Sequence, residues 1–208
     1  TRRRTRDAGL EVAAYGSYYV AAESEQSGLS FQNVLDTAVA LGAPCIRVWA
    51  GKRASDDADK VYYDRVIEDS WRIAGLANAA GIAVAYEYHG GTLTDTNASA
   101  HRLLNAAKHE NIKTLWQPSA VGTFESRLDG LQKMLPWLAN LHVYQWSETP
   151  PVRHPLSVGE AVWKPYLNMA ASTGRDLYAL LEFVRNDDPD SFLRDARTLK
   201  IWLEEMLQ

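Results

Sequence analysis

Residues 82–91 read Ile82-Ala83-Val84-Ala85-Tyr86-Glu87-Tyr88-His89-Gly90-Gly91, and this stretch carries the clearest structural signal in the chain. Its apolar and aromatic run predicts a strand over residues 82–89, closed by the glycine pair. Alternate residues of a strand share a face. One face of this strand therefore carries Ala83, Ala85, Glu87 and His89. Along this face, small residues are followed by polar ones, which predicts a barrel interior that opens into a site at the end of the strand.

Similar runs recur on both sides of this stretch. The strands are expected over residues 11–19, 45–49, 82–89, 113–117, 141–146 and 177–184. Segments with helical spacing separate them, such as Phe31 to Val39, which Gly42 ends. Strands that alternate with helices predict repeated β/α units, a parallel sheet and one domain over residues 1–208.

Two later segments carry turn or cap signals. The Pro-rich stretch from Pro150 to Pro155 predicts a loop, and Asp188-Pro189 predicts the start of the last helix. We expect one apolar face of that helix to be buried. Its members are Phe192, Ala196, Leu199, Leu203 and Met206.

The number of expected strands falls short of a closed barrel, which has about eight strands and about 250 residues. The opening Thr1 to Gly9 resembles the end of a helix followed by its C-terminal glycine. The prediction is therefore a (β/α)8 TIM barrel that lacks its first two β/α units in this chain. Open sheet edges invite pairing with another chain, so we expect this chain, taken by itself, to form a homo-oligomer, swap elements or aggregate.

Charge and composition restrict the kinds of partner that the chain is expected to bind. The 208 residues carry a net charge of -4, whereas nucleic-acid binding normally requires clustered basic residues. No apolar run is long enough to span a bilayer, so we expect neither nucleic acid nor membrane as a partner. Cys45 is the single cysteine and lies in an apolar run, which predicts a buried thiol and a reducing, cytoplasmic location.

Four polar side chains fall at or near expected strands: Glu87, Gln117, His142 and Glu182. In a barrel the strand ends converge on one opening. Two carboxylates, an imidazole and an amide oxygen suit a divalent ion such as Mn²⁺, Mg²⁺ or Zn²⁺. The alternatives are a rim carboxylate paired with arginine for Glu87 and a hydrogen-bonded structural residue for His142, which is expected to begin its strand.

Arg47 and Trp49 share a face of their strand, and an arginine in an apolar run requires an anionic partner. Arg47 either neutralises Glu87 or binds substrate oxygens, and the sequence leaves both open. Arg153 lies in a loop that should overhang the opening, where simple solvation is the alternative.

Several motifs resemble the xylose isomerase-like barrels that include sugar phosphate isomerases and epimerases. They are Tyr86 to Gly91, Leu115-Trp116-Gln117-Pro118, His142-Val143-Tyr144-Gln145-Trp146 and Leu181-Glu182-Phe183. The resemblance implies a divalent metal held by Glu87, Gln117, His142 and Glu182. Gln117 stands where the family has Asp, and Tyr144-Gln145 stands where many relatives carry Lys-Asp.

The resemblance also implies a function. Glu87 and Glu182 would be the catalytic pair that exchanges a proton beside a ketose carbonyl of a sugar or sugar phosphate, through an enediolate. The predicted substrate-binding residues are Arg47, Trp49, His89, Trp146 and Arg153. The alternatives are a degenerate sugar-binding barrel without catalysis and an abasic-site endonuclease, which the acidic charge disfavours.

Overall fold

Strands and helices alternate along the chain in the computed structural model, which describes residues 1–119, 122–148 and 151–206. The chain forms two compact units, Thr1–Leu115 and Trp116–Gln208. Pro150, which opens the predicted Pro-rich loop, lies outside the described residues. Within the described residues, no helix is long and apolar enough to cross a bilayer.

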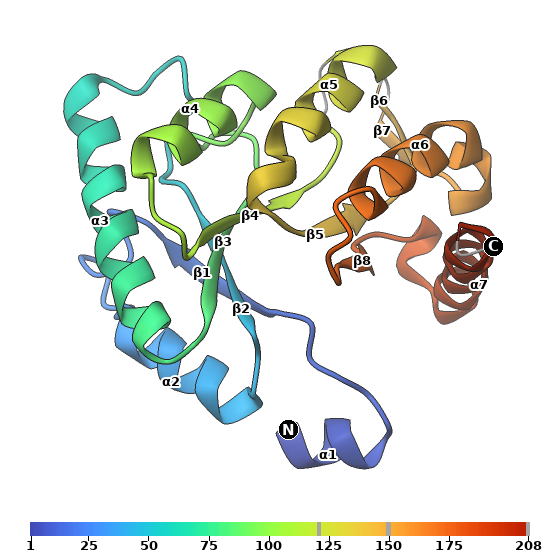
Figure 1. Cartoon of the computed structure of the whole chain (residues 1–208), viewed down its shortest axis with the longest axis horizontal. Helices are drawn as coiled ribbons and strands as arrows, with labels where there is room; N and C mark the ends of the chain where they lie inside the picture. Colours follow the sequence, from blue (N-terminus) through green and yellow to red (C-terminus); the bar gives the residue numbers. More distant parts are fainter. Residues whose placement is uncertain (120–121, 149–150, 207–208) are drawn as a thin grey trace. The chain divides into compact units, whose positions relative to one another are not determined.

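The first unit is a parallel sheet covered by helices (Figure 1). β1 pairs with β2, β2 with β3 and β3 with β4, all in parallel. Helices α2 and α3 pack against these strands, and α4 packs beside α3. The elements are α1 (Arg2–Asp7), β1 (Tyr15–Val20), α2 (Phe31–Leu41), β2 (Cys45–Trp49), α3 (Lys60–Ala79), β3 (Ala83–Glu87), α4 (Asn97–Ala107) and β4 (Ile112–Trp116).

Capping residues fix the helix boundaries in this unit. The Ser30 side chain accepts a hydrogen bond from Asn33 N at the start of α2. Gly42 ends the helix at φ 73°, a conformation that glycine adopts without steric cost. Thr96 and Ser99 form a reciprocal capping box at the start of α4. The left-handed Gly42 confirms the predicted end of α2.

The second unit contains a parallel strand pair and a short hairpin (Figure 1). β5 pairs with β8 in parallel, and β6 pairs with β7 in antiparallel orientation. The elements are α5 (Phe124–Met134), η1 (Leu135–Trp137), β5 (Leu138–Val143), β6 (Trp146–Glu148), β7 (Pro151–Arg153), η2 (Leu156–Gly159), α6 (Glu160–Ala171), β8 (Tyr178–Leu181), η3 (Arg185–Asp187) and α7 (Pro189–Glu205).

Some predicted boundaries were wrong. The first strand begins at Tyr15, not at Glu11. β5 begins at Leu138, because α5 ends at Met134 and a single 3-10 turn leads directly into the strand. The predicted Pro-rich loop contains β7, and Pro151 is compatible with a strand there because a two-stranded hairpin consists only of edges.

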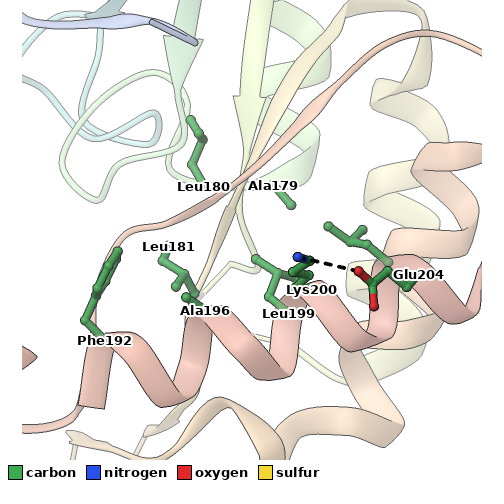
Figure 2. A pocket seen from close by; sticks show the side chains of 9 residues that line it. Ala179, Leu180, Leu181, Phe192, Ala196, Leu199, Lys200 and Glu204 are labelled. Carbon is green, nitrogen blue, oxygen red and sulfur yellow. Dashed lines mark ion pairs between the residues drawn. The ribbon is translucent and has the colours of Figure 1, made fainter. Parts of the chain in front are cut away.

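The predicted buried face of α7 was also partly wrong. The helix buries Ser191, Asp195, Leu199 and Trp202, whereas Phe192 is 49% exposed. Asp195 is buried because its carboxylate accepts a hydrogen bond from Leu156 N at 2.9 Å. Phe192, Ala196 and Leu203 instead line an open, largely apolar groove of about 480 Å³ against β8 (Figure 2).

Candidate active site

In both units, polar side chains lie at the carboxyl ends of parallel strands. Glu87 is the last residue of β3, and Gln117 directly follows β4. Glu182 directly follows β8. His142 is the penultimate residue of β5, so the expectation that it begins its strand was wrong. The early start of β5 moves His142 to the end of the strand at which the other three residues lie.

In the first unit, Glu87 is buried at 2% exposure and is held by two donors. Its Oε2 atom accepts hydrogen bonds from Arg47 Nη1 and from Trp49 Nε1. A buried carboxylate is costly without such partners, and an arginine beside it stabilises its charged form. The structure shows the first function considered for Arg47, which is to neutralise Glu87, and contact with substrate oxygens stays a prediction.

Aromatic rings form a wall beside this ion pair. The Trp49 ring lies 5.6 Å from the Tyr18 ring and 5.0 Å from the His89 ring, centroid to centroid. The Arg47 guanidinium lies 4.9 Å from the Trp49 ring centroid. Tyr18 is 73% exposed and was missed by the sequence reasoning. No sequence pattern pointed to Tyr18, because its place beside Arg47 depends on the pairing of β1 with β2.

The loop after β3 is fixed by threonine hydroxyls. Thr94 Oγ1 donates to the carbonyl oxygen of Glu87 at 2.6 Å, and Thr92 Oγ1 donates to that of His89 at 2.7 Å. Gly91 takes φ 75°, which closes the turn between them. These bonds hold the backbone of Glu87 and His89 in place, and the sequence analysis did not identify either threonine.

In the second unit, three potential metal ligands come together from three strand ends. His142 Nδ1 lies 2.9 Å from Gln117 Oε1 and 3.5 Å from Glu182 Oε1. The His142 and Glu182 side chains are 12% and 20% exposed. One ring proton on Nδ1 could serve only one of the two oxygens, whereas a cation among the three atoms would serve all of them.

The donor set fits a divalent cation. The second carboxylate oxygen of Glu182, Oε2, is buried and has no hydrogen-bond partner among the described residues. A buried charged oxygen without a donor is costly, and cation binding is one way to satisfy it. Carboxylate and amide oxygens suit Mg²⁺ and Mn²⁺, and the imidazole also suits Zn²⁺.

The β6–β7 hairpin places Trp146 and Arg153 next to each other. The Arg153 guanidinium lies 5.8 Å from the Trp146 ring centroid and 4.8 Å from the Phe183 ring centroid. The Trp146 and Phe183 rings are 4.9 Å apart. Arg153 also forms an ion pair with Asp187. The sequence reasoning missed Phe183 and Asp187, although Phe183 directly follows Glu182.

Direct contacts join the predicted residues within each unit. In the first unit they join Arg47, Trp49, Glu87 and His89. In the second unit they join Gln117 and Glu182 to His142, and Trp146 to Arg153.

Comparisons with known proteins agree with this architecture. The family profile described as xylose isomerase-like TIM barrel matches residues 1–205. No curated protein sequence matches the chain.

Among solved structures, the probable 3-DHS dehydratase AsbF of Bacillus anthracis is similar at a TM-score of 0.79 and 22% identity, covering 95% of this chain and 79% of that one. A xylose isomerase-like TIM barrel protein from Mycobacterium smegmatis, in complex with magnesium, has a TM-score of 0.77 and 14% identity, with coverages of 100% and 78%. D-psicose 3-epimerase from Clostridium cellulolyticum H10, solved with D-tagatose, has a TM-score of 0.72 and 14% identity, with coverages of 100% and 82%. At these identities the likeness establishes the fold.

Proposed function

The chain belongs to the xylose isomerase-like TIM barrel family, and on this premise we propose that it is a metal-dependent isomerase or epimerase of a sugar or sugar phosphate. The observation that carries the proposal is the Gln117, His142 and Glu182 cluster at the strand ends, with the buried Glu182 Oε2 lacking a partner among the described residues. The cluster lies at the carboxyl ends of strands, and enzymes with this fold have their catalytic residues at that end of the barrel.

The proposed metal ligands are Glu87, Gln117, His142 and Glu182. Glu87 is included because it is the last residue of β3, just as Gln117 directly follows β4. The strand ends of a barrel converge on one opening. The magnesium complex of the Mycobacterium smegmatis protein supports a divalent ion in this family. A bound divalent cation would polarise a substrate carbonyl.

Glu87 and Glu182 are the proposed proton-transfer groups. One carboxylate removes the proton from the carbon next to the ketose carbonyl, and the C–H electron pair becomes the double bond of an enediolate. The other carboxyl group returns a proton, to the opposite face of the same carbon for epimerisation or to the neighbouring carbon for isomerisation. The Arg47 partner supports this role because it stabilises Glu87 in the charged form that accepts a proton.

The proposed substrate contacts are Arg47, Trp49, His89, Trp146 and Arg153. Arg47 and His89 orient hydroxyl groups, and Trp49 offers a ring face to the sugar. Trp146 and Arg153 act from the β6–β7 hairpin, where the rings also exclude water from the intermediate. The D-psicose 3-epimerase solved with D-tagatose supports a ketose as the substrate class.

Gln117 favours a second candidate, a sugar-binding barrel without catalysis. An amide in place of a carboxylate removes one negative charge from the donor set, which weakens cation binding. The two candidates differ in one measurable step. Proton exchange beside the carbonyl requires catalysis, whereas sugar binding does not.

The test is proton NMR of ketoses and ketose phosphates incubated in D₂O with the metal-loaded protein. We expect deuterium to enter at the carbon next to the carbonyl, and Glu87→Gln and Glu182→Gln to abolish this incorporation. Circular dichroism of each variant controls for folding. Binding without deuterium incorporation would favour the second candidate, and wild-type exchange in both variants would refute the assigned roles.

A further inference from the structure

The β6–β7 hairpin holds an arginine in a defined aromatic cage. Arg153 ends β7, and its guanidinium rests against Phe183 and Trp146 at 4.8 and 5.8 Å from the ring centroids. The Tyr144 ring contacts both rings, with centroid distances of 5.1 Å to Trp146 and 5.8 Å to Phe183. Cation–π contact with two rings restricts the movement of the guanidinium and therefore of its donors.

Among the described residues, only one nitrogen of this guanidinium forms hydrogen bonds. Nη1 donates to the Asp187 carboxylate and, at 3.5 Å, to the Val184 carbonyl oxygen. The Nη2 and Nε donors have no partner among the described residues, and the side chain is 32% exposed. An arginine edge that presents two parallel N–H groups matches a carboxylate or a phosphate.

The internal partner of Arg153 is easily displaced. Asp187 is 73% exposed, so its carboxylate regains full hydration when it leaves the arginine. Exposed ion pairs of this kind contribute little to stability. Asp187 and its neighbour Asn186 both take positive φ values, 52° and 61°, which fixes the turn that presents the carboxylate.

The aromatic residues of the cage are close in sequence to two of the proposed metal ligands. Phe183 directly follows Glu182, and Tyr144 and Trp146 follow His142 at two and four positions. The rings that contact Arg153, and the Tyr144 ring beside them, are thus carried by the same chain segments as His142 and Glu182.

We propose that Arg153 binds a carboxylate or phosphate at the end of the substrate remote from the reacting carbon, and that Asp187 is the counterion which this group displaces. This inference rests on the proposed function and narrows it to anionic sugars. If Arg153 instead only ties the hairpin to residues 184–187, the charge of the ligand will not matter to affinity.

The test is calorimetric binding of three ketoses that differ only at carbon 6: D-fructose, D-fructose 6-phosphate and D-fructuronate, each to the Mn²⁺-loaded full chain. We expect at least one charged ketose to bind about tenfold or more tightly than D-fructose. Phosphate and carboxylate are distinguished by which of the two charged ketoses gains. Arg153→Gln should remove this preference, and Arg153→Lys should retain only part of it because it loses the planar fork.

Asp187→Asn is the matched variant, and we expect it to raise the affinity for the charged ketose rather than lower it. Removing the competing carboxylate should tighten binding of the favoured charged ketose by a few fold. Equal affinity for the three ketoses in the wild type, or a preference that survives in Arg153→Gln, would overturn the inference.

Failure of this inference differs from failure of the proposed function. Arg153→Gln leaves the four proposed metal ligands intact, so its Mn²⁺ affinity should equal that of the wild type. Deuterium incorporation into neutral ketoses, without any preference for charged ones, would leave the proposed function standing and remove the anion site.

Discussion

Nδ1 of His142 lies 2.9 Å from Oε1 of Gln117, so the imidazole and the amide oxygen are in direct contact within the second unit. Glu182 Oε1 approaches the same nitrogen at 3.5 Å. This convergence of one nitrogen and two oxygens is the structural basis of the metal-site proposal. If the proposal is right, the charge of residue 117 should directly affect metal affinity.

Gln117→Glu keeps the side-chain length and adds the negative charge that the amide lacks. We expect it to lower the Mn²⁺ dissociation constant by about tenfold, or ~1.4 kcal/mol, because affinity for hard cations rises with ligand charge. Isothermal titration calorimetry measures the change. The metal-free variant should be less stable than the wild type, because residues 117 and 182 both approach His142 Nδ1 and two carboxylates there would repel each other. Unchanged or weaker Mn²⁺ binding would exclude residue 117 as a ligand.

Metal binding should also stabilise the folded chain. At a free Mn²⁺ concentration of about 100 times the dissociation constant, the gain is about 2.7 kcal/mol, which corresponds to a rise of about 5 to 10 °C in melting temperature for a chain of this size. Glu182→Gln should remove most of this rise. Differential scanning fluorimetry with and without EDTA provides the measurement, and an equal rise in the variant would contradict a role for Glu182 in metal binding.

The Arg47–Glu87 pair should show strong thermodynamic coupling. Arg47→Met leaves the buried Glu87 carboxylate without its cation and should cost about 3 kcal/mol in the free energy of unfolding. Adding Glu87→Gln should recover about 2 kcal/mol of that loss. Urea unfolding of the metal-free protein measures all four members of the cycle.

Arg53→Met is the matched control for that cycle. Arg53 pairs with Asp59 at 3.5 Å, with side-chain exposures of 48% and 65%. Its loss should cost less than about 1 kcal/mol. A similar cost for the two arginine variants would show that burial does not strengthen the Arg47–Glu87 interaction.

Cys45 should make stability fall at alkaline pH. It is 5% exposed, and burial raises the pKa of its thiol from 9.0 to about 12. Above pH 9 the unfolded chain loses this proton while the folded chain keeps it, so the free energy of unfolding decreases as pH rises. Between pH 8 and 10 the loss from this group is roughly 1.4 kcal/mol.

Cys45→Ala isolates this contribution, because buried tyrosines with raised pKa values, such as Tyr86, remain in both proteins. Urea unfolding at pH 8 and pH 10 should show a smaller decrease in stability for the variant than for the wild type. Identical decreases would mean that the thiol ionises as readily in the folded chain as in the unfolded one.

The sequence predicted the fold and the main site residues because both depend on local patterns. Apolar runs and helix caps located the β/α units, and the strand over 45–49 was predicted to the residue. Glu87 was recognisable because a carboxylate at the end of an apolar strand requires a partner. The family motifs then selected Gln117, His142 and Glu182.

What the sequence did not predict depends on tertiary contacts. The β6–β7 hairpin was hidden because prolines suggest loops and only pairing reveals a strand. The buried face of α7 shifted because Asp195 binds the backbone of Leu156, which no helical periodicity records. Tyr18 and Asp187 are identified only by their contacts with Arg47 and Arg153.

The most direct test of the metal-site proposal is elemental analysis by mass spectrometry of wild-type protein and His142→Ala, purified without chelator. His101→Ala, which changes a histidine on α4, is the matched control. We predict a near-stoichiometric divalent metal in the wild type and in His101→Ala, and its loss in a folded His142→Ala. Absence of metal from the wild type, even after incubation with Mn²⁺, would contradict the proposed metal site and the chemistry that depends on it.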